Sequence, residues 1–304
     1  MKDQQVPYLI KSIGELHEFW GIGKPKHPLV SVFRLENTIP KLTLPEVHMF
    51  NFYAISIKKN FEGKMKYGQR NYDFDSGVMS FIAPHQVMQH KQGDSSPKEG
   101  ISLVFHPDFL AGFPLNKAIK NHGFFSYQLN EALHLSEQEE LTVGNIMKNI
   151  ESEYLSNIDK FSQNVIVSNI ELLLQYGDRY YNRQFITRKL ANDEILIRLE
   201  DLLSAYFDND SALESGMLTV KSLSDQLNIS PNYLSDMLRS ITGQTTQQHI
   251  HNKLMEKAKV LLTTTNLSAR EIAFQLGFEY PQSFNKLFKK RTEMSPLEFR
   301  ESFN

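Results

Sequence analysis

The chain has 304 residues, of which 40% are hydrophobic, so it is long enough to bury more than one core and two domains are expected. It contains no cysteine, which excludes disulfide bonds, thiolate zinc sites and a cysteine nucleophile. The net charge is −2, but residues 216–304 carry +3 and the remainder carries −5. This asymmetry suits a C-terminal part that faces nucleic acid on an acidic body.

The N-terminus predicts no targeting segment. Asp3, Lys11 and Glu18 interrupt any apolar run there, so no signal peptide is visible. No stretch approaches the roughly 20 apolar residues that a membrane-spanning helix needs. We therefore expect a cytoplasmic protein with no membrane partner.

From about residue 28 to 110 the sequence predicts short strands separated by turns. The runs with strand character are Val30 to Leu35, residues 50–57 and residues 101–105. Turn residues such as Ala83-Pro84 lie between them. Many short strands at this spacing favour a sandwich or a small barrel, and barrels of this size often hold one small ligand.

Residues 75–85, which read Asp-Ser-Gly-Val-Met-Ser-Phe-Ile-Ala-Pro-His, resemble the turn and strand of a cupin barrel. Metal-dependent cupins place two histidines one residue apart on a strand, with a glutamate downstream, so that the three side chains converge on one ion. His85, His90 and His106 do not have this spacing. We therefore predict no metal site and no cofactor, while a metal-free pocket stays open.

At about residue 136 the pattern changes to a helical one. Ser136 and Glu139 have the spacing of a capping box, and apolar residues at helical intervals follow as far as Tyr154. A second helical stripe begins at Ile166. Residues 131–185 are thus expected to form a helical hairpin, which could be an internal lid or a subunit contact. We favour the subunit contact and hence a homodimer.

Polar and charged residues from Asn182 to Asn192 suggest an interdomain linker, and an apolar stripe from Ile195 to Tyr206 predicts the first helix of the next domain. Beyond it, one pattern occurs twice. Residues 223–238 match residues 272–288, with an offset of 49 at the start and 50 at the end, so the second copy has one extra residue in its turn. Each copy predicts two short helices joined by a tight turn, a helix-turn-helix.

Local signals mark the turns and ends of these helices. Ser230-Pro231 is expected to cap and open a helix, and Gly243 to end it in a left-handed conformation. Gly277 is the predicted tight-turn residue of the second copy. His249 and His251 stand two apart on the connecting helix and point about 200° apart, so they are not expected to share a metal.

Residues 268–300 carry an ordered set of motifs: Glu271-Ile272-Ala273, Leu276-Gly277-Phe278, Phe288-Lys289-Lys290 and Met294-Ser295-Pro296-Leu297-Glu298-Phe299-Arg300. These resemble the signature of the AraC family of bacterial regulators, and the resemblance covers about 110 residues, roughly from 193 to the end. It implies two helix-turn-helix units on a linker helix, each with its second helix in one of two successive major grooves of double-stranded DNA.

The resemblance also implies which side chains face DNA. By position, the first reading helix carries Asn232, Ser235, Asp236 and Arg239, and the second carries Gln282, Ser283, Asn285 and Lys286. Asn and Gln can pair with adenine edges and Lys with guanine, and each good contact contributes about 1–3 kcal/mol. The basic run that includes Lys289 and Lys290 is expected to contact phosphates. Glu293 and Asp236 depart from the family, which commonly has a glycine and a basic residue at these positions.

The sequence as a whole predicts an α+β protein that is a DNA-binding transcription regulator and not an enzyme. Residues 1–130 form a cupin-like β-barrel with a sensory role, 131–185 a helical pair, and 190–304 an all-α domain with helix-turn-helix units near 220–243 and 269–292. A small-molecule effector is expected in the N-terminal domain, and RNA polymerase as a partner if the protein activates. The alternatives are a cupin enzyme, metal-free or metal-dependent, with an accessory DNA-binding tail, and an architectural protein without sequence preference.

Overall fold

The computed structural model describes residues 6–39, 45–59, 66–67, 70–71, 77–89, 99–128, 131–157, 159–208 and 216–303. The chain divides into two compact units, Met1–Gln184 and Phe185–Asn304. No helix within the described ranges is long and apolar enough to cross a membrane.

The N-terminal unit is built on an antiparallel sheet of five strands in the order β10-β7-β4-β9-β2. These strands are β2 (Val30–Arg34), β4 (Tyr53–Lys59), β7 (Val78–Ile82), β9 (Glu99–Phe105) and β10 (Leu133–His134). A second sheet has the order β1-β3-β8, from β1 (Tyr8–Ile10), β3 (Val47–Phe50) and β8 (Met88–Gln89). A further two-stranded ladder pairs β5 (Lys66–Tyr67) with β6 (Arg70–Asn71).

The described strands do not close into a barrel. β2 and β10 are the two edges of the five-stranded sheet, and the three-stranded sheet is separate from it. The mixed helix-and-sheet class is therefore present, whereas the cupin-like barrel predicted from the sequence is not confirmed.

The prediction of one strand across residues 50–57 is wrong. β3 ends at Phe50 and β4 begins at Tyr53, and the two strands belong to different sheets. Between them the Asn51 amide donates to the Ile10 carbonyl at 3.1 Å, which leads the backbone out of one sheet and into the other. The run beginning at Val30 also ends early, because Leu35 opens a short 3₁₀ helix, η1 (Leu35–Asn37).

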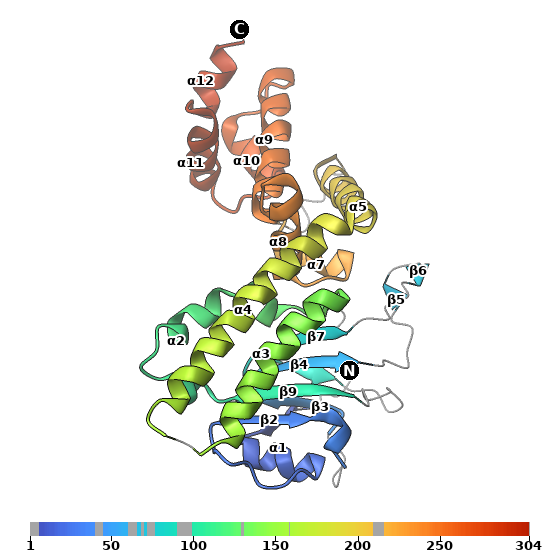
Figure 1. Ribbon diagram of the computed structural model, residues 1–304. Coiled ribbons are helices and arrows are strands. Elements are labelled where there is room, and N and C mark those ends of the chain that lie inside the picture. The colour runs from blue at the N-terminus through green and yellow to red at the C-terminus, as the bar shows by residue number, and fades with distance from the viewer. Residues whose placement is uncertain are drawn as a thin grey trace. The chain divides into compact units, whose positions relative to one another are not determined.

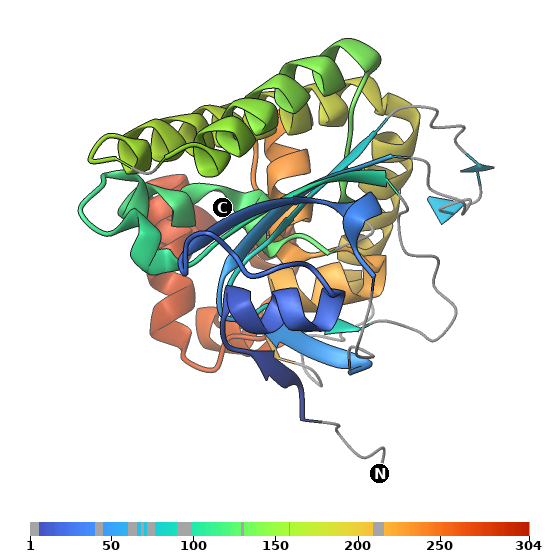
Figure 2. The ribbon, with the colours of Figure 1, turned by 60° about the horizontal axis from the view of Figure 1, so that its bottom comes forward.

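One face of the five-stranded sheet packs on α1 (Ile13–Trp20) and on the three-stranded sheet (Figures 1 and 2). We call this the inner face. Its core joins apolar side chains from both sheets and from α1, all of them buried: Ile10, Ile13, Leu16, Phe19, Phe33, Phe50, Phe52, Ala54, Ile82, Met88 and Val104. Strand alternation therefore places every second residue of β4, β7 and β9 toward this core.

The opposite, outer face is covered by α3 (Glu137–Leu155) and α4 (Ser162–Thr187), which lie side by side across it (Figures 1 and 2). Ser136 caps α3 with the predicted capping box. Gly177 of α4 permits close contact, because a Cβ there would lie 3.1 Å from the Phe81 ring of β7. Short helices complete this unit: η2 (Pro107–Leu110), α2 (Leu115–Ala118), η3 (Ile119–Asn121) and η4 (Gly123–Ser126).

The segment predicted as an interdomain linker contains the division between the two units, but it is helical. α4 continues to Thr187, and α5 (Lys189–Asp208) begins two residues later. The side-chain amide of the buried Asn192 donates to the Phe185 carbonyl. This side chain therefore stabilises the junction between α4 and α5.

The C-terminal unit is entirely helical in its described part. After α5 it contains α7 (Val220–Leu227), α8 (Pro231–Thr242), α9 (Thr246–Thr264), α10 (Ala269–Gln275), α11 (Pro281–Thr292) and α12 (Pro296–Glu301). The long helix α9 packs against α5, α8, α10 and α12. Its buried side chains therefore form the centre of the core: Thr246, Ile250, Leu254, Met255, Ala258, Leu261 and Leu262.

Glu293 adopts a backbone conformation that favours glycine. It ends α11 at φ 64° and ψ −2°, and the equivalent residue of the first copy, Gly243, ends α8 at φ 74° and ψ 2°. Glutamate in place of the family's usual glycine thus leaves the turn unchanged, but it puts a non-glycine residue in the left-handed backbone conformation.

We expect Glu293→Gly to raise the free energy of unfolding by about 1 kcal/mol, because a left-handed conformation costs a non-glycine residue roughly 1–2 kcal/mol. Denaturant unfolding followed by far-ultraviolet circular dichroism measures this change. Gly243→Ala is the matched control and should destabilise by a similar amount. A Glu293→Gly variant that is no more stable than the parent protein would show that the glutamate side chain compensates for the strain.

Candidate nucleic-acid interface

The repeat seen in the sequence is also a repeat of helix caps. Thr219 caps α7 and Ser268 caps α10, and each forms a capping box with the residue three positions on. Thr245 caps α9 and Ser295 caps α12 in the same way. Because each box satisfies backbone donors at a helix start, both copies begin their helices at equivalent positions.

The ends of the second helices match as closely. The Thr242 hydroxyl donates to the Leu238 carbonyl at 2.8 Å, and the Thr292 hydroxyl donates to the Phe288 carbonyl at 2.9 Å. The amide two residues after each threonine donates back to that hydroxyl. Each threonine therefore fixes the turn that follows its helix, a role that the sequence analysis did not assign.

The tight turns of the two copies differ in their residues. Asn228 ends α7 at φ 57°, whereas the corresponding turn after α10 places Gly277 at φ 85°. A Cβ at Gly277 would lie 2.7 Å from the Gly216 carbonyl oxygen. Glycine at 277 is thus required both by its conformation, as predicted, and by the close approach of a neighbouring backbone segment.

α8 and α11 are the second helices of the two copies, and each begins with a proline. Ser230 caps α8 by accepting from the Tyr233 amide, as predicted, while Tyr280 precedes α11 without a side-chain cap. Both helices are held by a buried face, Leu234 and Leu238 in α8 and Phe284 and Phe288 in α11.

The sequence-predicted DNA-facing residues form a stripe on each of these helices. Positions separated by three, four and seven residues lie on one face of a helix. In α8 this stripe is Asn232, Ser235, Asp236 and Arg239. The residues 50 positions later, which occupy the equivalent places in α11, are Gln282, Asn285, Lys286 and Lys289. The two stripes are therefore structurally equivalent, and Ser283 and Lys290 flank the second one.

Exposure differs between the two stripes. In α11 the four stripe residues, and Ser283 and Lys290 with them, are exposed. In α8 Asn232 and Arg239 are exposed, while Ser235 and Asp236 are half-buried. The Ser235 hydroxyl lies 3.0 Å from the hydroxyl of the fully buried Thr246. Ser235 thus joins α8 to α9. The sequence analysis had placed Ser235 among the DNA-facing residues and did not predict this contact.

The electrostatics of the two stripes also differ. Asp236 and Arg239 form an ion pair of 3.3 Å within the first stripe, so its charges cancel. α11 instead carries Lys286, Lys289 and two further cations, Lys290 and Arg291, and has no acidic residue. The second stripe is therefore the more attractive to a polyanion.

A histidine, His251, lies beside this basic run. The His251 ring nitrogen Nδ1 is 3.3 Å from Arg291. Burial, followed by the charges of Arg291 and Lys290, lowers the pKa of His251. His249 faces elsewhere, with Nε2 3.0 Å from the Thr242 hydroxyl, so the two histidines have different partners.

Comparison with known proteins gives matches over the same residues. The family model described as a helix-turn-helix domain matches residues 223–302. The HTH-type transcriptional activator RhaS of Escherichia coli O81 (strain ED1a) is 24% identical over 272 residues, covering 88% of this chain and 91% of its own. The solved C-terminal domain of the two-component response regulator yesN from Fusobacterium nucleatum is 36% identical, with 33% of this chain and 96% of that chain covered and a TM-score of 0.30.

These similarities support an AraC-family transcription regulator. Its function is DNA-binding transcription regulation. The E. coli K12 regulator YijO, 32% identical over 107 residues, covers 35% of this chain and 38% of its own length. The family model covers the repeat, and the similarity to RhaS covers 88% of this chain.

His85 and His106, two of the three histidines considered for a metal site, have different surroundings. His85 is exposed in a turn at φ 63°, and His106 lies 3.3 Å from Asp108 and 3.3 Å from Asn51. His90 lies outside the described residues. Within the described part of the chain, no three His, Asp or Glu side chains come together as a metal ion would require.

Proposed function

We propose that this AraC-family regulator reads two neighbouring segments of double-stranded DNA, one with α8 and one with α11. The observation that carries the proposal is the equivalence of the two surface stripes, which occupy the same helix positions in both copies. Second helices of helix-turn-helix units enter the major groove, where amide and ammonium side chains contact base edges. Relatives named as transcription regulators favour this function over the alternative of a cupin enzyme.

The two stripes are proposed to contribute differently. Gln282, Asn285 and Lys286 offer base-reading donors, and Lys289 and Lys290 add charge for phosphates. In the first stripe Asn232 and Arg239 are the exposed readers, while Asp236 suits cytosine, whose exocyclic amine is a donor. The second copy then supplies most of the affinity, and the first copy mainly discriminates among sequences.

Alanine variants test these roles on a duplex recovered by selection from a random library. Gln282→Ala and Lys286→Ala should each weaken binding to that duplex by about 1–3 kcal/mol and relax its sequence preference. Lys290→Ala should weaken binding to the selected duplex and to random duplexes equally. It should also reduce the slope of log affinity against log salt concentration by about 1. Equilibrium titrations at several salt concentrations distinguish the two effects.

Ser235→Ala is the matched control. It removes a partner of the buried Thr246 hydroxyl, so it should lower the free energy of unfolding and leave discrimination unchanged. If the Gln282→Ala, Lys286→Ala double variant discriminates between the selected and random duplexes as well as the parent protein does, the assigned roles are wrong.

We further propose that the N-terminal unit is the cupin-like sensory half that the sequence predicts, and that a small-molecule effector binds on its inner face. Strand register places Ser80, Ser56 and Ser102 side by side across β7, β4 and β9, and all three are more than 90% buried. The Ser56 and Ser102 hydroxyls are 2.7 Å apart, and the Ser80 hydroxyl has no hydrogen-bond partner among the residues that the structure describes. Such a buried polar row is costly to a core and useful to a ligand.

Lys58 extends this row, because it follows Ser56 by two residues on the same face of β4. Burial lowers the pKa of its ammonium group, and no ion pair neutralises it among the described residues. An effector with an acceptor group would satisfy both Lys58 and Ser80. The buried hydroxyls and the lysine thus support an effector site.

Lys58→Met tests this assignment without knowledge of the effector. A partly buried amine that is kept for binding lowers stability, so the variant should have a free energy of unfolding about 1–2 kcal/mol larger than the parent protein. The neighbouring Lys59→Met is the control, since it removes the ion pair with Glu140 and should not stabilise. A Lys58→Met variant that is less stable than the parent protein would mean that the amine has a structural role.

The α3–α4 hairpin is proposed to form a homodimer. Val165 and Leu172 are exposed and lie seven residues apart on α4, and Leu141 and Leu155 are exposed on α3. Exposed apolar side chains at this spacing suit packing against a second copy. Where the regulator activates, RNA polymerase becomes a further partner.

Sedimentation of the full-length protein tests the dimer. We expect a dimer at micromolar concentration and a shift toward monomer in a Val165→Ser, Leu172→Ser double variant. A Val260→Ser variant, which changes an exposed apolar residue of the C-terminal unit, is the control and should leave the dimer intact. A parent protein that sediments as a monomer would contradict the proposal.

A further inference from the structure

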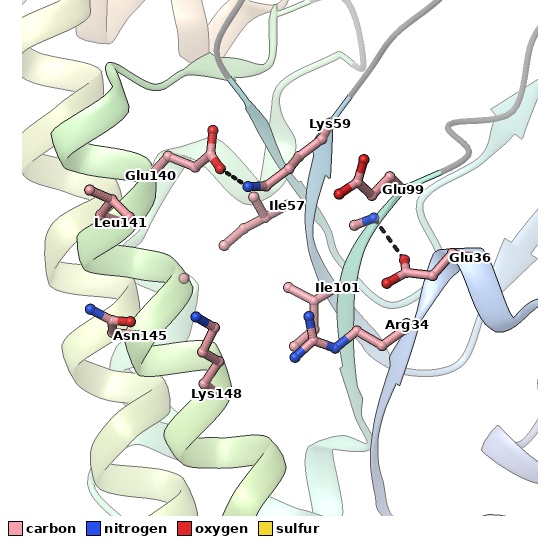
Figure 3. Close-up of a pocket in the computed structure, with 12 residues that line it drawn as sticks. Arg34, Glu36, Ile57, Lys59, Glu99, Ile101, Glu140, Leu141, Asn145 and Lys148 are labelled. Atoms are coloured by element: carbon pink, nitrogen blue, oxygen red, sulfur yellow. Dashed lines mark hydrogen bonds and ion pairs between the residues drawn. The ribbon is translucent and has the colours of Figure 1, made fainter.

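A pocket of about 230 Å³ lies between α3 and one end of the five-stranded sheet, on the outer face (Figure 3). Ile57 of β4 and Ile101 of β9 are register partners and form its apolar floor. Pockets for drug-sized ligands measure roughly 300–1,000 Å³, so this one fits a smaller molecule. It is distinct from the serine row, because Ile57 points away from the face that carries Ser56 and Lys58.

Two ion pairs join α3 to the sheet on either side of this pocket. Lys59 of β4 pairs with Glu140 near the start of α3. Arg34 of β2 pairs with Glu151 further along the helix, with its Nε 2.9 Å from the carboxylate. Glu140 also accepts from the Gly77 amide at 3.0 Å. These pairs tie α3 to the sheet and neutralise two of the three cations that line the pocket, Arg34 and Lys59.

The remaining polar groups divide between the two walls. On α3, Lys148 and Asn145 are exposed, and Lys148 has no ion-pair partner in the described part of the chain. Across the hollow lies Glu36, whose carboxylate accepts from the Gly100 amide at 3.1 Å through one oxygen, and Glu99 stands beside it at the start of β9 (Figure 3). One wall is thus positive and the other negative.

Gly144 gives independent evidence of open space. It lies on the pocket-facing side of α3, between Glu140 and Lys148. A Cβ built at Gly144 would meet no atom within 4 Å. Glycine costs roughly 1 kcal/mol relative to alanine inside a helix, and no neighbouring atom of the described residues requires glycine here, so the space beside α3 is open to a ligand.

We propose that this pocket binds a small aliphatic zwitterion with one carboxylate and one ammonium group. The carboxylate pairs with Lys148 and hydrogen-bonds to Asn145, and the ammonium group lies at Glu36. The aliphatic part contacts Ile57 and Ile101. A simple anion would face Glu36 and a simple cation would face Lys148, so only a molecule with both charges satisfies both walls.

Such a ligand would add a third link between α3 and the sheet, beside the two ion pairs. Binding would therefore stabilise the packing of α3 on the sheet. This inference goes beyond the DNA-reading function and does not depend on it.

Thermal unfolding of the full-length protein tests the ligand class. The probes are L-alanine, L-valine, L-norvaline and L-leucine, each at millimolar concentration. The half-charged controls are 4-methylpentanoate and isopentylamine, which match leucine in shape and lack one of its two charges. We expect at least one amino acid to raise the Tm in a saturable manner and both controls to leave it unchanged. No shift with any of the four amino acids, or an equal shift with a half-charged control, overturns the proposal.

Variants test the location. Lys148→Ala and Glu36→Gln should each weaken amino-acid binding at least tenfold, while Glu36→Gln keeps an oxygen for the Gly100 amide. Gly144→Met should fill the pocket, abolish the ligand-induced shift and leave the unliganded protein at least as stable as before. Lys117→Ala, which removes an exposed lysine of α2, should change nothing.

The same variants separate this site from the serine row. If the shift persists in Lys148→Ala and Gly144→Met, or disappears in Lys58→Met instead, the ligand occupies another position and the pocket proposal is wrong. That outcome leaves the DNA-reading proposal unaffected, because it is measured on the selected duplex.

Discussion

Burial of α9 is the constraint on which the C-terminal unit depends. Both helix-turn-helix copies pack on this one helix. Its residues Ile250, Leu254 and Ala258 are fully buried by that packing, which removes their apolar surface from water. Arg300 of α12 adds to this, since its guanidinium donates to the carbonyls of Leu262 and Leu267 beyond the last buried turn. A helix of 19 residues is about 28 Å long, close to the roughly 34 Å between successive major grooves.

The two copies share a frame and differ on the surface that the frame presents. Equivalent caps and threonine-fixed turns set α8 and α11 in the same way, but the first stripe has a neutralised Asp236–Arg239 pair and the second is cationic. Electrostatic attraction acts on any DNA sequence, whereas amide and guanidinium contacts select among sequences. The proposed division of affinity and selectivity between the copies would follow from these side chains alone, without a difference in fold.

The sequence predicted features that depend on neighbours within a few residues. Capping at Ser136 and Ser230 and the turns at Gly243 and Gly277 are local, and the structure confirms them. Features that depend on distant residues were not predictable. The strand break at Asn51 is made by the Ile10 carbonyl, and Ser235 turns toward Thr246 of another helix. The pocket under α3 likewise arises from strand register and from ion pairs between residues about 80 and 117 positions apart.

The most direct test of paired reading is the dependence of affinity on the spacing between the two DNA boxes of the selected duplex. A rigid α9 predicts that inserting about half a helical turn, roughly 5 base pairs, lowers affinity to that of a duplex with one box, because the second box then faces away. Affinity that is unchanged by the insertion would mean that the two copies do not read the duplex together, and would contradict the account.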